Sequence, residues 1–499
     1  MANLKSLAKD TAIYGLSSIV GRFLNYLLVP LYTAKLSAES GGYGVITNMY
    51  AYTALLLVIL TYGMETTFFR FANKEGEDPQ RVYSTILISV GATSAAFVAL
   101  VLAFIGPLSA FMGYADHPSY VWVMAMTVAI DAFQCIPFAY LRYMKRPVKF
   151  AALKLLFIVV NIALNLFCFI ALPHITGRPT DVGYAFYINL ACTAGITLCF
   201  RRELTGFGYV FDRRLMGRML AYGWPVLVLG IAGILNQTAD KILFPYIYDA
   251  PDAHQQLGIY GAASKVAMVM AMITQAFRYA YEPFVFGKSR DSDNRDTYAR
   301  AMKFFVIFTL MAFLVVVGYI GLLKFIIARD YWGGLRVVPI VMAAEIMMGV
   351  YFNLSFWYKL TDRTVWGAWF SGAGCVVLIA VNVVFVPRYG YMACAWAGVA
   401  GYATAMLLSY FVGQRYYPIS YPLDRIFSYV ALAAVLYAGM AQANARLPLA
   451  AALAVNTALI AVFVAYTIWR DFPLGALPVV GRRLARGKGT DNDNTQDNK

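Results

Sequence analysis

The chain has 499 residues, of which 61% are hydrophobic and only 13% are charged. A soluble globular protein has about 45–50% apolar and about 25% charged residues, so this chain has too few charges to cover a water-facing surface. Its net charge of +15 lies in short loops between apolar runs, which is typical of membrane topology and not of a nucleic-acid-binding face. The composition therefore predicts an integral membrane protein with no nucleic-acid partner.

Runs of about 20 apolar residues predict membrane-spanning helices, and fourteen such runs occur in the chain. The connections between them are short, mostly 4–18 residues, so no soluble domain fits between two spans. The predicted spans lie near residues 11–35, 43–69, 83–111, 119–141, 150–172, 183–200, 219–245, 258–284, 301–323, 337–358, 364–386, 391–413, 426–443 and 448–469.

The distribution of basic residues predicts the orientation of these spans. An even number of spans places both termini on one side of the membrane. Of the 41 Lys and Arg residues, 28 fall in segments on the side of the termini, 7 fall on the opposite side and 6 fall within spans. Because cytoplasmic loops carry an excess of Lys and Arg, we expect both termini to be cytoplasmic.

The sequence also contains an internal repeat. Gly15–Pro30 (GLSSIVGRFLNYLLVP) aligns without gaps with Gly230–Pro245 (GIAGILNQTADKILFP). The alignment continues through Tyr43-Gly44 with Tyr260-Gly261, Tyr62 with Tyr279, Glu65 with Glu282 and, more loosely, Asp131 with Glu345. The seventh span thus begins a second copy of the segment that starts with the first span. Because six helices separate the two copies, they run in the same direction and predict two lobes around a central cleft.

The span count, the parallel six-helix repeat and a basic link between the lobes resemble the multidrug/oligosaccharidyl-lipid/polysaccharide (MOP) flippase superfamily. The N-terminal segments LAKDTAIYGLSSIVGRFLNYLLVPLYTAKLS and YGVITNMYAYTALLLVILTYGMETTFFRF are similar to its polysaccharide-transporter branch. That branch includes the flippases of O-antigen and capsule repeats, and the lipid II flippases are close relatives. The resemblance implies transfer of a polyprenyl-pyrophosphate-linked oligosaccharide from the cytoplasmic to the outer leaflet of the bacterial inner membrane, for surface polysaccharides such as lipopolysaccharide.

The predicted fold class is therefore an all-α polytopic membrane protein. It has about 14 transmembrane helices, arranged as two six-helix lobes in parallel repeat around a central cleft, with two extra C-terminal helices. The expected domains are an N-terminal lobe (1–200), a basic cytoplasmic linker (201–218), a C-terminal lobe (219–413), spans 13 and 14 (414–470) and a disordered cytoplasmic tail (471–499).

Several polar residues within the spans are candidates for binding the cargo. A charge near mid-bilayer costs about 2.5–3.5 kcal/mol on insertion scales, so such residues are expected to face the protein interior or a wet cavity. The donor fork of an arginine suits a pyrophosphate, and in lipid II flippases spans 1 and 8 also supply cavity arginines. The candidate substrate-binding residues are Arg22, Asn25, Arg278, Gln237, Lys241 and Lys265. An alternative for Arg278 is an i, i+4 ion pair with Glu282.

Carboxylates within the spans are candidates for coupling transport to an ion gradient or for gating. They are Glu65, Asp131, Asp240, Glu282 and Glu345, and the alternative for each is a structural pairing with a neighbouring cation. The resemblance implies no cofactor other than a coupling proton or sodium ion. The six cysteines and three histidines show no metal-ligand spacing, so we expect no metal site.

Two other functions remain open at this point. A multidrug/cation antiporter on the same fold would favour a site dominated by carboxylates, whereas cations slightly outnumber anions in these spans. A membrane glycosyltransferase or ligase would need a folded domain around a metal-binding D-x-D string. The only such strings, Asp291-Ser-Asp293 and Asp491-Asn-Asp493, lie in a short loop and in the tail. We therefore expect no catalytic residues. The expected partners are membrane lipids, the lipid-linked glycan, and the polysaccharide polymerase or glycosyltransferase machinery.

Overall fold

The computed structural model describes residues 26–177, 179–288, 295–361 and 363–471, without the side chains of residues 279, 280 and 282–288. Within these ranges the chain is helical and contains no strand. Twelve of the described helices are long and apolar enough to cross a membrane. The fold class predicted from the sequence, an all-α polytopic membrane protein, is therefore confirmed.

The two remaining predicted spans are accounted for separately. The span near 183–200 forms a 16-residue helix, α10 (Gly183–Leu198). The span near 11–35 is described only from residue 26, as helix α2 (Leu28–Lys35). The first residue of the predicted disordered tail, Asp471, instead ends the last described helix; the rest of the tail, like both D-x-D strings, lies outside the described residues.

The chain divides into two compact units, each described here by itself. The larger unit comprises the described residues of Met1–Gly287 and of Ile326–Tyr417, and the smaller unit comprises those of Lys288–Phe325 and of Pro418–Lys499. The expected boundaries between lobes, linker and tail stay a prediction.

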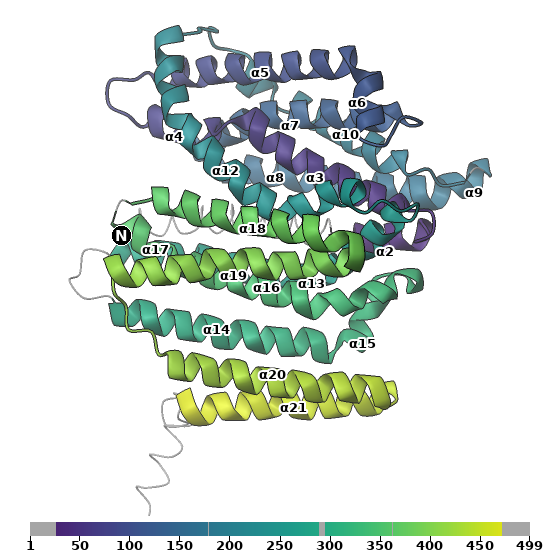
Figure 1. The fold of residues 1–499 in the computed structure, drawn as a ribbon. Helices are drawn as coiled ribbons and strands as arrows, with labels where there is room; N and C mark the ends of the chain where they lie inside the picture. Colours follow the sequence, from purple (N-terminus) through teal and green to yellow (C-terminus); the bar gives the residue numbers. More distant parts are fainter. Residues whose placement is uncertain (1–25, 178, 289–294, 362, 472–499) are drawn as a thin grey trace, which may run out of the picture. The chain divides into compact units, whose positions relative to one another are not determined.

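The first part of the larger unit continues from α2 to a short helix at the start of the basic link (Figure 1). Its further helices are α3 (Gly42–Thr61), α4 (Met64–Ala72), α5 (Pro79–Ala103), α6 (Ile105–Phe111), α7 (Pro118–Tyr143), α8 (Pro147–Leu166), the π-helix η1 (Phe167–Ala171), α9 (Leu172–Thr176), α10 and α11 (Arg201–Leu204).

The second part of the larger unit begins with the two longest helices. Its helices are α12 (Arg213–Ile247), α13 (Ala253–Lys288), the 3-10 helix η3 (Arg329–Val337), α16 (Val338–Leu354), α17 (Phe356–Leu360), α18 (Val365–Tyr389) and α19 (Tyr391–Tyr416). Helix α12 packs against α3 and α4, which precede it in the sequence, and against α18 and α19, which follow it. It thereby joins the two parts of the larger unit.

Helix starts and breaks follow from local sequence. The Asp212 carboxylate caps α12, because its Oδ1 accepts hydrogen bonds from the backbone N–H groups of Arg214 (2.9 Å) and Leu215 (3.0 Å). The predicted second span is broken at Tyr62 and Gly63, which both have positive φ angles, of 32° and 72°. Glycine adopts this conformation without a steric penalty, so the turn between α3 and α4 falls here.

Glycines allow two pairs of helices to approach closely. A Cβ atom added at Gly44 of α3 would lie 1.8 Å from the carbonyl oxygen of His254 on α13, and one at Gly258 would lie 2.9 Å from the nitrogen of Gly44. Similarly, a Cβ atom at Gly374 of α18 would lie 2.7 Å from the carbonyl oxygen of Gly401 on α19. Backbone therefore meets backbone at both contacts, as small residues permit in membrane helix packing.

The smaller unit contains α14 (Arg295–Gly318), α15 (Ile320–Leu323), α20 (Leu423–Arg446) and α21 (Leu449–Asp471), with α14 packed against both α20 and α21. Its polar centre is the Asp471 carboxylate, whose side chain is 1% exposed. This carboxylate accepts from the ammonium of Lys303 (2.5 Å), the guanidinium of Arg425 (3.2 Å) and the hydroxyl of Tyr429 (2.5 Å). One carboxylate thus ties all three long helices of the unit together.

Candidate functional site

A cavity of about 540 Å³ lies in the larger unit, between α3 and five helices of the second part of the chain, α12, α13, α16, α18 and α19. This volume is within the range of small-molecule sites, about 300–1,000 Å³. Five of the predicted site residues line it: Gln237, Asp240, Lys241, Lys265 and Glu345.

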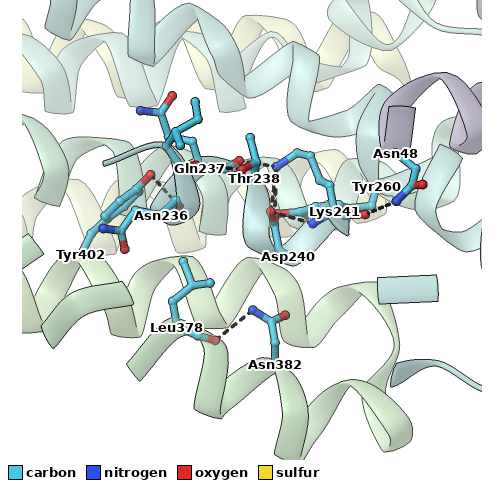
Figure 2. A network of polar contacts seen from close by, with 11 residues as sticks. Asn48, Asn236, Gln237, Thr238, Asp240, Lys241, Tyr260, Leu378, Asn382 and Tyr402 are labelled. Carbon is cyan, nitrogen blue, oxygen red and sulfur yellow. Dashed lines mark hydrogen bonds and ion pairs between the residues drawn. The ribbon is translucent and has the colours of Figure 1, made fainter. Parts of the chain in front are cut away.

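Helix α12 supplies the most polar part of the wall (Figure 2). The ammonium of Lys241 folds back onto its own helix, 3.0 and 3.1 Å from the two carboxylate oxygens of Asp240 and 3.0 Å from the carbonyl oxygen of Gln237. Asp240 also accepts from the hydroxyl of Tyr260 (2.6 Å) and from the backbone N–H of Lys241 (2.9 Å). The carboxylate is therefore held by three donors while its side chain is only 9% exposed.

A second interaction connects α12 to the first part of the chain. The side-chain amide of Asn48, on α3, donates to the backbone carbonyl of Lys241 (2.8 Å), and its oxygen accepts from the hydroxyl of Tyr114 (2.8 Å). Asn48 is 1% exposed. The polar run of α12 is thus fixed from both sides of the cavity.

The other two charged residues in the cavity are arranged differently. Lys265, on α13, and Glu345, on α16, both line the cavity, and neither forms an ion pair within the described part of the chain. Lys265 is the second cation of the cavity beside Lys241, and Glu345 is its second carboxylate beside Asp240. The cavity therefore presents one neutralised ion pair and two separate charges.

Two of the predicted carboxylates lie elsewhere in the larger unit. Glu65, on α4, pairs with the guanidinium of Arg142 and accepts from the thiol of Cys135 (3.1 Å), both on α7. Asp131, also on α7, accepts from the hydroxyl of Thr193 on α10 (3.2 Å). Neither carboxylate lines the cavity described above.

Of the remaining predicted residues, Arg278 has a described side chain, and it is not part of this cavity wall. Arg278 lies on α13 with its guanidinium 4.9 Å from the ring centroid of Phe352, and it is exposed. Arg22, Asn25 and the side chain of Glu282 lie outside the described residues, so the expected pairing of Arg278 with Glu282 stays a prediction.

Sequence reasoning missed the tyrosines of the cavity and one of its two amides, Asn236. Five tyrosines line the wall: Tyr26, Tyr43, Tyr50, Tyr260 and Tyr402. The internal repeat could have found several of these residues, because its alignment pairs Tyr43 with Tyr260 and Tyr26 with Lys241. The two copies of the repeat therefore place equivalent positions around one cavity. Asn236 and Tyr402, joined by a 3.1 Å hydrogen bond from the Tyr402 hydroxyl to the Asn236 carbonyl, carry no such signal.

Among the described residues, no group of three or more His, Cys, Asp or Glu side chains could hold a metal ion. The polar groups of the cavity are ammonium, carboxylate, phenol, hydroxyl and amide groups. Such a set can bind a polar or ionic cargo by hydrogen bonds and charge.

Solved structures of membrane transporters share this fold. A lipid II flippase, MurJ, in an inward closed conformation matches 92% of this chain and 99% of its own, with a TM-score of 0.69 and 13% identity. An inward-facing multidrug resistance transporter of the MATE family of the MOP superfamily matches 81% of this chain and 94% of its own, with a TM-score of 0.60 and 14% identity. The MATE multidrug transporter DinF-BH, solved in complex with a ligand, matches 82% of this chain and 95% of its own, with a TM-score of 0.58 and 17% identity. At these identities the likeness establishes a shared fold.

The sequence itself identifies the family. No curated protein sequence matches the chain significantly. The family model described as "Polysaccharide biosynthesis protein" matches residues 7–280, which is more than half of the chain. This match, together with the shared fold, bears out the resemblance inferred from the sequence: the chain belongs to the polysaccharide biosynthesis protein family.

Proposed function

We propose that this protein is a flippase that moves a polyprenyl-pyrophosphate-linked oligosaccharide from the cytoplasmic to the outer leaflet of a bacterial inner membrane. The observation that carries the proposal is the cavity lined by Lys241 and Lys265 in a chain of the polysaccharide biosynthesis family. Its cargo would serve surface polysaccharides such as O-antigen, and polysaccharide polymerases or glycosyltransferases would act before and after it.

The cations of the cavity suit the charged end of such a cargo. A lysine ammonium is a compact point charge that binds phosphate oxygens. Its interaction with phosphate is stronger where water is excluded. The two lysines come from different helices, α12 and α13, so they can contact one diphosphate from two directions. Arg22 and Arg278 remain proposed ligands of the same pyrophosphate on its path to the cavity.

The uncharged part of the wall suits the glycan. Phenol rings offer an apolar face for a sugar ring and a hydroxyl for its edge. Gln237 adds an amide group, which can both donate to and accept from sugar hydroxyls. Five tyrosines and this amide in one cavity therefore favour a polyhydroxyl headgroup over a purely apolar cargo.

Transport itself needs no bond to be made or broken, and the proposal assigns no catalytic residue. The headgroup would enter the cavity while the prenyl tail stays in lipid, and rocking of the two lobes would then expose it to the other side. The glycine contact between α3 and α13 would have to open during this motion. A proton or sodium gradient would supply the driving force by binding to carboxylates within the spans. Among these carboxylates, Glu345 lines the cavity and forms no ion pair among the described residues.

One observation favours a second candidate, a multidrug/cation antiporter on the same fold. Glu345 and Asp240 both line the cavity, and carboxylates are suited to an organic cation. For Asp240, however, Lys241 already occupies the position of such a cation. The flippase therefore remains the preferred function.

Mass spectrometry of polyprenyl-pyrophosphate lipids tests the proposal. Deleting the gene from the source organism should cause a glycan-loaded lipid to accumulate, and wild-type protein should relieve the accumulation. Lys265→Ala, Arg22→Ala and Arg278→Ala, produced at wild-type levels, should fail to relieve it, because each removes a proposed phosphate ligand. Lys35→Ala, which removes an exposed lysine outside the cavity, is the matched control and should restore the wild-type lipid profile.

The same experiment separates the two candidates. Deletion without accumulation, combined with new sensitivity to cationic dyes, would contradict the flippase and support the antiporter. In that case Glu345→Gln should abolish dye resistance, and Lys265→Ala should leave it intact.

A further inference from the structure

The ion pair between Asp240 and Lys241 has an unusual geometry. The two residues are consecutive in α12, so their side chains leave the helix about 100° apart. They meet only because the long lysine chain turns back toward its own helix, where Asp240 and the carbonyl oxygen of Gln237 accept from its ammonium. The lysine is therefore withdrawn from the space of the cavity that it lines.

The other lysine of the cavity, Lys265, differs from Lys241 in its surroundings. Within the described ranges no carboxylate lies at ion-pair distance from Lys265, and the residue lines the same cavity as Lys241. Glu345 lines the same cavity but does not pair with Lys265, so Lys265 is a cation without an ion-pair partner among the described residues, and such an ammonium attracts an anion. A pyrophosphate held by Lys265 would in turn attract the ammonium of Lys241, because charge-assisted bonds to phosphate are strong.

Asp240 can release Lys241 without losing all of its partners. Its carboxylate would keep the hydroxyl of Tyr260, at 2.6 Å, and the backbone N–H of Lys241, at 2.9 Å. These two donors do not depend on the position of the lysine ammonium. They reduce the cost of leaving a carboxylate in a low-dielectric site after the cation has moved.

We propose that Asp240 is an internal stand-in for the anionic cargo: in the empty cavity its carboxylate holds Lys241, and a pyrophosphate displaces it and takes Lys241 together with Lys265. The inference rests on the proposed function, and it adds a determinant of specificity. A cargo has to compete with Asp240 for Lys241, so a diphosphate succeeds where a single carboxylate or a monophosphate does not.

Binding of farnesyl pyrophosphate to the purified full-length protein in detergent, measured by calorimetry, tests the proposal. Asp240→Asn removes the competing charge and keeps the shape, so it should bind the probe about tenfold more tightly than wild type, which corresponds to about 1.4 kcal/mol. The gain should disappear in the double variant Asp240→Asn/Lys241→Gln, because Lys241 is the group that is released. Farnesyl monophosphate should bind wild type weakly and should gain more from Asp240→Asn than the pyrophosphate does.

A second variant tests the part assigned to Tyr260. Tyr260→Phe removes the donor that remains with Asp240 after the exchange, so it should weaken binding of the pyrophosphate probe several-fold. Tyr351→Phe is the matched control, since the hydroxyl of Tyr351 donates to the backbone carbonyl of Gly367 (3.1 Å) outside the cavity. It should bind the probe as wild type does.

The outcomes separate this inference from the proposed function. Unchanged or weaker binding by a folded Asp240→Asn protein, with its melting temperature near that of wild type, would overturn the stand-in role. A tighter-binding Asp240→Asn protein in an organism whose gene deletion accumulates no lipid-linked glycan would uphold the stand-in role and refute the flippase. Absence of probe binding by wild type and all variants would overturn both.

Discussion

Charged residues in the membrane-spanning helices are neutralised by different means at different positions. Lys241 is neutralised by its neighbour in the sequence, whereas Glu65 is neutralised by Arg142, 77 residues away. Of these two ion pairs, only Asp240–Lys241 could be suspected from the sequence, because its residues are adjacent. Lys265 and Glu345 form no ion pair among the described residues, and they line the cavity. The contrast shows why a membrane charge alone cannot distinguish a structural residue from a functional one.

Asp471 provides a residue-scale prediction about stability. Its carboxylate faces Lys303, which is 8% exposed, as well as Arg425 and Tyr429. Asp471→Asn should lower the free energy of unfolding by about 3 kcal/mol, because removing one partner leaves a buried ammonium without its counter-charge. Thermal unfolding in detergent, followed by the circular dichroism of the helices, should show a lower melting temperature.

The control for this prediction is Asp424→Asn. Asp424 lies in the first turn of α20, in the same unit, and is exposed. Exposed charges contribute little to stability, so its melting temperature should stay close to that of wild type. Equal effects of the two substitutions would show that the Asp471 cluster is not a stabilising centre.

At the scale of elements, packing between helices depends on a few glycines. The internal repeat aligns Gly44 with Gly261, and both lie where α3 and α13 approach each other. A Cβ atom at Gly261 would lie 2.4 Å from the hydroxyl of Thr47 on α3. Equivalent glycines of the two repeats thus serve one contact between the two parts of the chain.

Gly44→Ala should therefore be harmful. The new methyl group would overlap the carbonyl oxygen of His254, and overpacking of this kind costs about 1–3 kcal/mol. We expect a lower melting temperature and, in the deletion strain, incomplete relief of lipid accumulation. Gly217→Ala on α12 is the matched control, because no atom lies within 4 Å of its added Cβ. Alanine favours a helix over glycine by about 1 kcal/mol, so the control should be as stable as wild type or more so. A wild-type melting temperature for Gly44→Ala would contradict the close approach.

At the scale of the whole molecule, the twelve candidate spans and α10 are those that the apolar runs predicted, and the basic residues predict how they are oriented. This orientation can be tested in a cysteine-free background, since the native cysteines are not in disulfides. His117→Cys, in the exposed loop before α7, should react with a membrane-impermeant maleimide in intact cells. Glu75→Cys, in the exposed loop after α4, should react only after the cells are opened. The reverse pattern would invert the predicted topology.

The sequence by itself determined that the chain spans a membrane many times as helices, because the bilayer requires long apolar runs whose backbone groups bond within one helix. Its repeat and its motifs determined the family. It also identified Gln237, Asp240, Lys241, Lys265 and Glu345 as intramembrane polar residues, since polar groups are rare there.

Only the tertiary structure decided which of these residues meet. It placed those five residues around one cavity, joined Glu65 to Arg142 away from it, and brought Asn48 of α3 to the backbone of Lys241. Contacts of this kind join residues that are far apart in the sequence, as the 193 positions between Asn48 and Lys241 show. They depend on the angles at which helices cross and on the rotation of each helix about its axis. Glycine contacts and polar networks together determine this geometry, and the hydrophobic periodicity of the sequence does not encode it.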